Sequence, residues 1–189
     1  MQDITEAFEI TRAQKREPQV IVYNIDKKIQ AEELLEGLLQ KNCFLHDANN
    51  VPLVKIEFPI LARNKESRHW VVAIDPIIFK ELWLKQGLYF NWSRVRFTEV
   101  IGIRQCRTCG AFGHRAKYYD DEDKPPIFEN CSLLKTENHS YRVPTRKNCI
   151  IANEKFKRNW HTTHSEFDKR CESYLRQKDI LVKRTNYGN

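Results

Sequence analysis

Cysteine and histidine recur after residue 100 at spacings that suit a bound metal ion. Cys106, Cys109 and His114 form the pattern Cys-x2-Cys-x4-His. A tight turn between the cysteines can present both thiolates to one tetrahedral ion, and Gly110 and Gly113 let the backbone wrap around it. These residues match the first three ligands of a CCHC zinc knuckle, so the sequence predicts Zn²⁺ as a cofactor.

The fourth ligand position of this first knuckle holds Tyr119 where a CCHC knuckle has cysteine. A phenol binds zinc poorly at neutral pH because it would first have to ionise. Three alternatives remain open: three residues and a water hold the ion, a distant group such as Cys131 completes the site, or zinc is lost. Among these we favour Cys131.

A second segment matches the same frame with fewer ligands. Its pattern is Cys131-x2-Leu134-x4-His139-x4-Pro144, so two of the four ligand positions are replaced. Taken alone, such spacing is more often structural coincidence than a metal site. Because it follows a better knuckle, it indicates an eroded repeat, with Cys131 and His139 as candidate ligands.

A third segment lacks only the second cysteine of the frame. Cys149 is followed by Ala152 at that position, and then by His164 and Cys171. The nearby His161 could replace the missing ligand. Taken alone, this spacing too is more often coincidence than a metal site. Because it follows two similar segments, it favours a third repeat with Cys149, His164 and Cys171 as candidate ligands.

Cations surround the first knuckle, and residues 102–119 contain no acid. Attraction of phosphate is therefore built into the motif, and Phe112 could stack on an unpaired base. We expect single-stranded RNA or DNA as the partner, contacted by Phe112 and by the basic side chains Arg104, Arg107, Arg115 and Lys117.

The net charge of +7 is concentrated near the C-terminus. Residues 142–189 hold 12 Lys and Arg against 5 Asp and Glu, and the charges before them cancel. A basic segment after a neutral domain favours a polyanionic partner, although a frayed, solvated tail would have the same composition.

Neither a membrane span nor a secretory signal is visible. No apolar run approaches the roughly 20 residues that cross a bilayer, and residues 1–16 lack an apolar signal segment. Clustered cysteines with interspersed histidines then favour metal binding over disulfides. We expect an intracellular protein, cytoplasmic or nuclear, with no membrane partner.

The elements that must position these motifs lie upstream. β-Branched and alternating apolar residues predict four strands, and leucines at helical spacing and Pro76 predict two helices. The order βαββαβ predicts an α+β fold, the ferredoxin-like arrangement that includes the RNA-recognition motif. The expected elements are strand 19–25, helix 31–42, strand 54–58, strand 69–75, helix 76–87 and a strand within 88–101.

The predicted sheet offers a weak base-binding surface. An RNA-recognition motif stacks bases on aromatic residues of its first and third strands, but the matching position of the first strand is Ile21. Trp70 could be an exposed platform, although its alternation with Val72 favours the core face. Arg94 and Arg96 could contact phosphate on the open face, or lie on a merely solvated strand.

Three stretches together resemble one protein family. They are His69-Trp-Val-Val-Ala, Leu88-Tyr-Phe-Asn-Trp-Ser-Arg-Val-Arg and Arg104-Gln-Cys-Arg-Thr-Cys-Gly-Ala-Phe-Gly-His, and they resemble the gag-like proteins of arthropod non-LTR retrotransposons. The resemblance implies an RNA-recognition-like domain followed by tandem CCHC knuckles, in a protein that coats the element's RNA and self-associates in a ribonucleoprotein. Departures at Tyr119, Leu134, Pro144 and Ala152 indicate a diverged or domesticated copy.

The domains expected are a linker (1–18), the RNA-recognition-like domain (19–101), the knuckle region (102–175) and a basic tail (176–189). We do not expect an enzyme. His164 and Glu166 match half of the zinc-deaminase signature, but the only Cys-x-x-Cys lies upstream without its proline. The leading interpretation is binding of single-stranded nucleic acid, in particular RNA, with low sequence specificity. The alternative is a protein-interaction module with eroded, non-binding knuckles.

Overall fold

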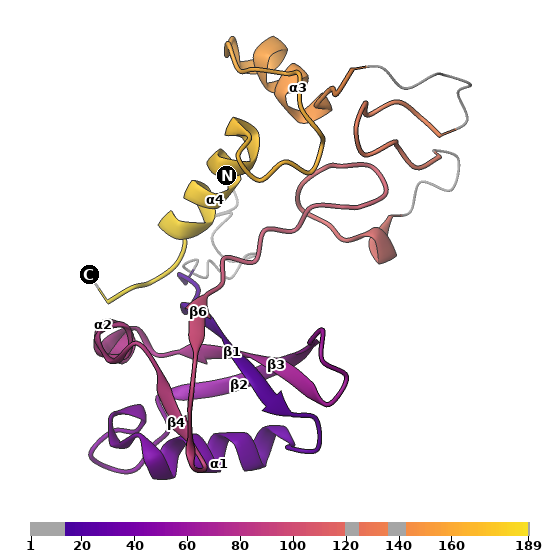
Figure 1. Ribbon diagram of the computed structural model, residues 1–189. Helices are drawn as coiled ribbons and strands as arrows, with labels where there is room; N and C mark the ends of the chain where they lie inside the picture. Colours follow the sequence, from indigo (N-terminus) through magenta and orange to yellow (C-terminus); the bar gives the residue numbers. More distant parts are fainter. Residues whose placement is uncertain (1–13, 120–124, 136–142, 189) are drawn as a thin grey trace, which may run out of the picture. The chain divides into compact units, whose positions relative to one another are not determined.

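The chain forms two compact units in a computed structural model that describes residues 14–119, 125–135 and 143–188 (Figure 1). The first unit contains residues 14–100 and 184–188, and the second contains residues 101–183. The sequence predicts a boundary after residue 101, and the second unit begins at Ile101. None of the helices in the described ranges is long and apolar enough to cross a membrane.

The first unit is built on an antiparallel sheet, so the expected α+β class is confirmed. Its four strands have the order β2-β3-β1-β6, and a separate hairpin pairs β4 with β5. The elements of this unit are β1 (Gln19–Asp26), α1 (Ala31–Lys41), η2 (Cys43–Leu45), β2 (Val54–Leu61), β3 (Ser67–Ile74), α2 (Pro76–Lys85), β4 (Leu88–Phe90), β5 (Ser93–Val95) and β6 (Phe97–Glu99).

Capping residues set the bounds of α2. The Asp75 carboxylate accepts a hydrogen bond from the Ile77 N–H at 2.9 Å, and Pro76 occupies the first turn, where no N–H is needed. The helix ends at Gln86, whose φ of 55° is left-handed. The sequence predicts Gly87 for this role, so the helix is shorter than expected.

The core lies between the sheet and the helices. Trp70 is only 4% exposed and packs with Val72, Leu34 and Leu38. The core-face interpretation of Trp70 is therefore confirmed, and Trp70 offers no platform for a base. Tyr23 is an aromatic residue of β1 on the sheet face away from the core, two residues after Ile21. Its hydroxyl lies 2.7 Å from the Thr98 hydroxyl.

Residues 88–101 form three short strands where the sequence predicts one. The backbone folds back at Asn91, which has a left-handed φ of 51°, and this turn joins β4 to β5. Arg94 consequently lies on the small hairpin, where its guanidinium donates to the Lys85 carbonyl at 2.6 Å. Arg96 is exposed between β5 and β6, and its carbonyl accepts a hydrogen bond from the Tyr23 N–H of β1 at 3.0 Å.

The last described residues return to the first unit. The Arg16 N–H donates to the Arg184 carbonyl at 2.9 Å, and the Asn186 N–H donates to the Arg16 carbonyl at 2.7 Å. Tyr187 packs on the Phe79 ring at 5.1 Å between centroids. A basic tail is expected over 176–189, but backbone pairing and an aromatic contact give residues 184–188 fixed partners.

The part of the second unit that the structure describes consists mostly of loops and hairpins. The helical elements of its described part are η3 (Ala116–Tyr118), α3 (Lys147–Phe156) and α4 (Glu172–Lys183). Neither α3 nor α4 is predicted from the sequence, where both segments are assigned to knuckles or tail. Buried cysteines occur on or beside both helices, so these elements position the site.

Candidate metal centres

The first candidate centre is the first Cys/His cluster, formed by Cys106, Cys109 and His114. Their ligand atoms all lie within 4.8 Å of one another, and Cys109 Sγ is 3.4 Å from His114 Nε2. A hairpin brings them together: the Cys106 N–H donates to the Ala111 carbonyl at 2.8 Å, and the Gly110 N–H donates to the Cys106 carbonyl at 2.9 Å. The structure thus gathers the three residues that the sequence pattern selects.

The turn inside this cluster requires glycine. Gly110 has a left-handed φ of 76°, and a Cβ there would lie 2.6 Å from the Glu166 Cγ. The left-handed backbone disfavours a side chain at this position, and the close approach of Glu166 leaves no room for a Cβ.

Hydrogen bonds to sulfur favour a thiolate in the first cluster. Burial raises the pKa of Cys106, but the N–H groups of Cys109 and Thr108 outweigh it, so the net pKa is lowered. The Thr108 N–H lies 3.4 Å from the Cys106 sulfur. Burial raises the pKa of Cys109. Because the thiolate is the metal-binding form, Cys106 is the better prepared ligand.

A fourth protein ligand is not found beside the first cluster within the described ranges. The Tyr119 ring stacks against the His114 ring, with 6.2 Å between centroids and 11° between planes. Cys131 is the expected substitute, but its sulfur does not join this group or the second one. Cys131 belongs to a second hairpin, residues 128–133, whose backbone hydrogen bonds hold its sulfur away from the first cluster. The prediction that Cys131 completes the first site is therefore wrong for this structure.

The second hairpin has the same backbone hydrogen bonds as the first. The spacing pattern of the sequence aligns Cys131 with the first cysteine, whereas the structure aligns it with the second. The Phe128 N–H donates to the Leu133 carbonyl at 2.8 Å, and the Ser132 N–H donates to the Phe128 carbonyl at 2.9 Å. Phe128 therefore takes the place of Cys106, and Cys131 takes the place of Cys109. Ser132 adopts the left-handed φ of 58° that Gly110 has in the first hairpin. His139, the other candidate ligand of this segment, lies outside the described residues.

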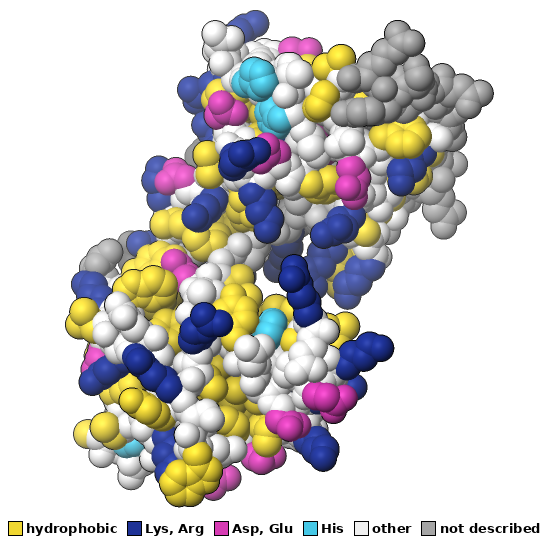
Figure 2. Space-filling model, viewed as in Figure 1, with side chains coloured by type: hydrophobic (Ala, Val, Ile, Leu, Met, Phe, Trp, Pro, Cys, Tyr) yellow, Lys and Arg dark blue, Asp and Glu magenta, His cyan; other side chains and the backbone are white. Residues whose placement is uncertain are grey.

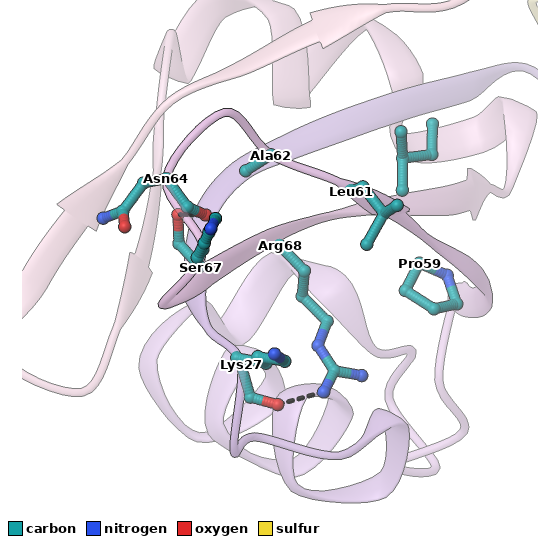
Figure 3. A pocket seen from close by; sticks show the side chains of 9 residues that line it. Lys27, Pro59, Leu61, Ala62, Asn64, Ser67 and Arg68 are labelled. Atoms are coloured by element: carbon teal, nitrogen blue, oxygen red, sulfur yellow. Dashed lines mark hydrogen bonds between the residues drawn. The ribbon is translucent and has the colours of Figure 1, made fainter.

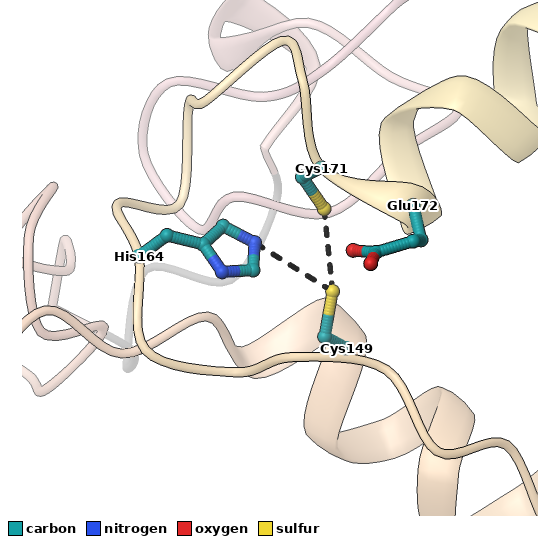
Figure 4. Close-up of side chains that lie close together, drawn as sticks. All are labelled: Cys149, His164, Cys171 and Glu172. Carbon is teal, nitrogen blue, oxygen red and sulfur yellow. Dashed lines mark hydrogen bonds between the residues drawn. The ribbon is translucent and has the colours of Figure 1, made fainter.

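The second candidate centre is the second Cys/His cluster, formed by Cys149, His164, Cys171 and Glu172. Their ligand atoms all lie within 4.8 Å of one another. Cys149 Sγ is 3.2 Å from Cys171 Sγ and 3.8 Å from His164 Nε2. The four side chains converge from α3, a loop and the start of α4 (Figure 4).

Sequence reasoning missed Glu172 and named His161 instead. The His161 ring stacks on the His164 ring at 5.7 Å between centroids, beside the cluster rather than in it. Ala152 lies on α3, so no cysteine turn exists at that point. The signal that could have found Glu172 is its position directly after Cys171, where a helix begins.

The second cluster is largely shielded from water. Cys149 and Cys171 are buried, whereas Glu172 is exposed. Burial raises the pKa of the Cys149 thiol, and the nearby Cys171 raises it further. Burial lowers the pKa of His164. The imidazole is therefore held in the neutral form that binds a metal.

A fully buried pair of charged residues, Arg146 and Glu166, connects the segments of the second unit. The Glu166 carboxylate accepts hydrogen bonds from the Ser132 hydroxyl and the Lys147 N–H, both at 2.9 Å, and from the Asn148 amide. Ser132 belongs to the second hairpin and Lys147 to α3. The pKa of Glu166 is raised, chiefly because the carboxyl group is buried. These contacts give Glu166 a structural role between the second hairpin and α3.

Arg146 fixes the loop that carries the second cluster. Its guanidinium donates to the carbonyls of Ser165 and Asp168 at 3.3 Å, to that of Glu166, and to the Ser173 hydroxyl at 3.1 Å. Three of these acceptors lie between His164 and Cys171 in the sequence, and Ser173 follows Cys171. Arg146 thus holds the loop between its two ligands and just beyond the second.

The predicted phosphate contacts are available on the surface of the second unit. Phe112 is half-buried, and the Arg146 guanidinium lies 5.8 Å from its ring centroid. Figure 2 shows Lys and Arg side chains distributed over the visible faces of both units. The exposed cations near the first cluster are those of Arg104, Arg107, Arg115 and Lys117.

Comparisons with protein-family models, with curated proteins and with solved structures each give no match to this chain. The resemblance to gag-like proteins therefore stays a prediction. What can be concluded about function rests on the two Cys/His clusters, which could hold a metal ion, and on the surface around them.

Proposed function

We propose that this chain binds single-stranded nucleic acid, RNA in particular, with low sequence specificity, through a metal-stabilised second unit. The observation that carries the proposal is the first Cys/His cluster together with the exposed cations of residues 102–119, a segment that contains no acid. A compact metal-bound hairpin holds such cations at fixed spacing, and phosphate is the anion that a basic surface of this kind attracts along a strand.

Zinc is the metal that the donor sets favour. Thiolate and imidazole ligands in a small cluster suit tetrahedral Zn²⁺, which has no redox chemistry of its own. Cys106, Cys109 and His114 would hold one ion, and a water is the fourth ligand consistent with the position of Tyr119. Cys149, His164, Cys171 and Glu172 supply a full set of four protein donors. In both places zinc would fix the fold and would not act on a substrate.

The first unit supports the same proposal at the level of its fold. The strand order β2-β3-β1-β6 and the intervening helices α1 and α2 fit a ferredoxin-like, RNA-recognition-like arrangement. Its sheet contributes little stacking, because Trp70 is buried. We infer a gag-like role in which the second unit supplies the affinity and the chain coats RNA by self-association in a ribonucleoprotein.

A protein-interaction module is a second candidate, and one observation in the first unit favours it. A hollow of about 480 Å³ lies at the β2–β3 hairpin, where Arg68 donates to the Lys27 carbonyl (Figure 3). Leu61, which lines it, is 92% exposed. An exposed leucine beside cations suits an acidic, apolar peptide.

Salt-dependent binding separates the two candidates. The full-length, zinc-loaded protein is titrated against a fluorescein-labelled 12-nucleotide oligo(U) by anisotropy at several salt concentrations. We expect affinity to fall steeply as salt rises. Arg115→Ala combined with Lys117→Ala should weaken binding and reduce the slope of log K against log salt by about 1.4, since each single-strand phosphate contact contributes about 0.7.

The matched control is Lys28→Ala combined with Lys65→Ala, which removes two exposed cations of the first unit. This control should leave the slope unchanged. Absence of binding at low salt would overturn the proposal in favour of the interaction module.

A further inference from the structure

Within the second unit, one hollow combines aromatic rings with positive charge. Its volume is about 180 Å³, and its lining comes from the first hairpin, from α3 and the loop after it, and from α4. We call it the α3–α4 hollow. The lining residues that carry the argument are Phe112, Phe156, Trp160, Arg176 and Gln177.

Aromatic rings enter the α3–α4 hollow from separate segments. Phe112 belongs to the first hairpin, Phe156 is the last residue of α3, and Trp160 follows in the loop. Phe156 is 55% exposed, so its ring does not serve a closed core. The half-buried Trp160 is held by paired backbone hydrogen bonds with the Asn153 amide, both at 2.9 Å. The backbone of Trp160 is therefore held in place without a ligand.

Charge around the hollow identifies the class of ligand. Two cations lie over the Phe156 ring: the Lys155 ammonium at 5.6 Å from its centroid and the Arg176 guanidinium at 6.0 Å. Among the described residues, Arg176 is the only charged one that lines the hollow, and no acid does. A ligand with a flat ring and an attached anion satisfies both features, because the ring stacks on the aromatics while the anion meets the cations.

The hollow also offers an amide for recognition of a ring edge. The Gln177 side chain lines it and makes no hydrogen bond to another described residue. An amide can donate to and accept from the polar edge of a base. A purely hydrocarbon ligand would leave this group without a partner.

We propose that the α3–α4 hollow binds one unpaired nucleobase of a single strand, with the adjoining phosphates on Lys155 and Arg176. This inference rests on the proposed nucleic-acid binding and assigns a stacking site to it. The base stacks against Phe156 and Trp160. The first hairpin, through Phe112, and the two helices contribute to the same site, so the strand contacts both metal-bound parts of the unit.

The test compares two labelled 12-nucleotide probes of equal charge, oligo(U) and an oligomer whose central nucleotides are abasic. The wild-type, zinc-loaded protein should bind oligo(U) roughly tenfold more tightly than the abasic probe, because stacking of a base contributes that much. Phe156→Leu and Trp160→Leu remove rings without changing charge. Each should weaken binding of oligo(U) severalfold and leave its salt slope unchanged, while binding of the abasic probe stays the same.

Trp92→Leu is the matched control, since Trp92 is an exposed aromatic residue of the first unit, and it should bind both probes as the wild type does. Zinc content and far-UV circular dichroism establish that each variant is folded. Equal binding of both probes by the wild type, or a full base preference in Phe156→Leu and Trp160→Leu, overturns the stacking site while salt-dependent binding stands. Failure to bind either probe at low salt refutes the proposed function and this inference together.

Discussion

Glu172 shows how a single carboxylate can change the chemistry of a cluster. Cys149, His164 and Cys171 alone supply three donors, and Glu172 supplies a fourth from the first residue of α4. A carboxylate is an accepted zinc ligand, though a harder one than a thiolate. Its position at a helix N-terminus also suits a negative charge, which the helix dipole stabilises.

The role of Glu172 can be tested by comparing two substitutions. Glu172→Gln should weaken zinc binding at the second cluster by at least about tenfold, since even second-shell changes at zinc sites have effects of this size. His161→Ala should leave affinity unchanged, because the His161 ring only stacks on His164. A competitive chelator titration of full-length protein measures both. Equal affinity of Glu172→Gln and wild type would remove Glu172 from the site.

At the scale of the elements, the two hairpins show that one backbone arrangement can be built with different side chains. Both use the same backbone hydrogen bonds and a left-handed residue at the same position, yet Phe128 stands in the second hairpin where Cys106 stands in the first. In the second hairpin, the Ser132 hydroxyl also donates a hydrogen bond to the Glu166 carboxylate. The hairpin is therefore compatible with a residue other than cysteine at this position.

The buried Glu166 should be one of the most sensitive positions of the second unit. Glu166→Ala leaves the donors of Ser132 and Asn148 without their acceptor and Arg146 without its carboxylate neighbour. Leaving buried donors without an acceptor in this way typically reduces the free energy of unfolding by about 1–3 kcal/mol per group. Hydrogen–deuterium exchange should show faster exchange of α3.

Glu154→Ala is the control for this variant, because Glu154 is an exposed acid on α3. It should exchange at the wild-type rate. Unchanged protection of α3 in Glu166→Ala would show that the metal-binding clusters, and not the buried pair, hold these segments together.

The sequence predicts the elements of the first unit better than those of the second. Period-two and helical apolar patterns locate β1, α1, β2, β3 and α2 because each element buries one face. The first cluster is predicted because its ligands lie within nine residues. The second cluster is only partly predicted, since the approach of Glu172 depends on how a loop closes around Arg146. The register of the second hairpin is set by backbone hydrogen bonds, which the spacing of cysteine and histidine in the sequence does not indicate.

For the whole molecule, the two units should respond differently to removal of metal. The first unit has an apolar core of its own, whereas the second unit would depend on its Cys/His clusters if they hold zinc as proposed, because structural zinc supplies folding free energy directly. A strong chelator should therefore abolish exchange protection in residues 101–183 and spare β1 and β3. Retained protection in the second unit after chelation would show that its buried polar network is sufficient.

The pairing of residue 16 with residues 184–186 has a consequence for how such a chain can change over generations. Val100 donates to the Gln19 carbonyl, and Arg184 accepts from Arg16, so the chain leaves and re-enters the first unit beside the start of β1. Residues 101–183 are thus a cassette between two neighbouring anchor points. A segment inserted in this way can be shortened or exchanged without changing the strand order of the unit that carries it.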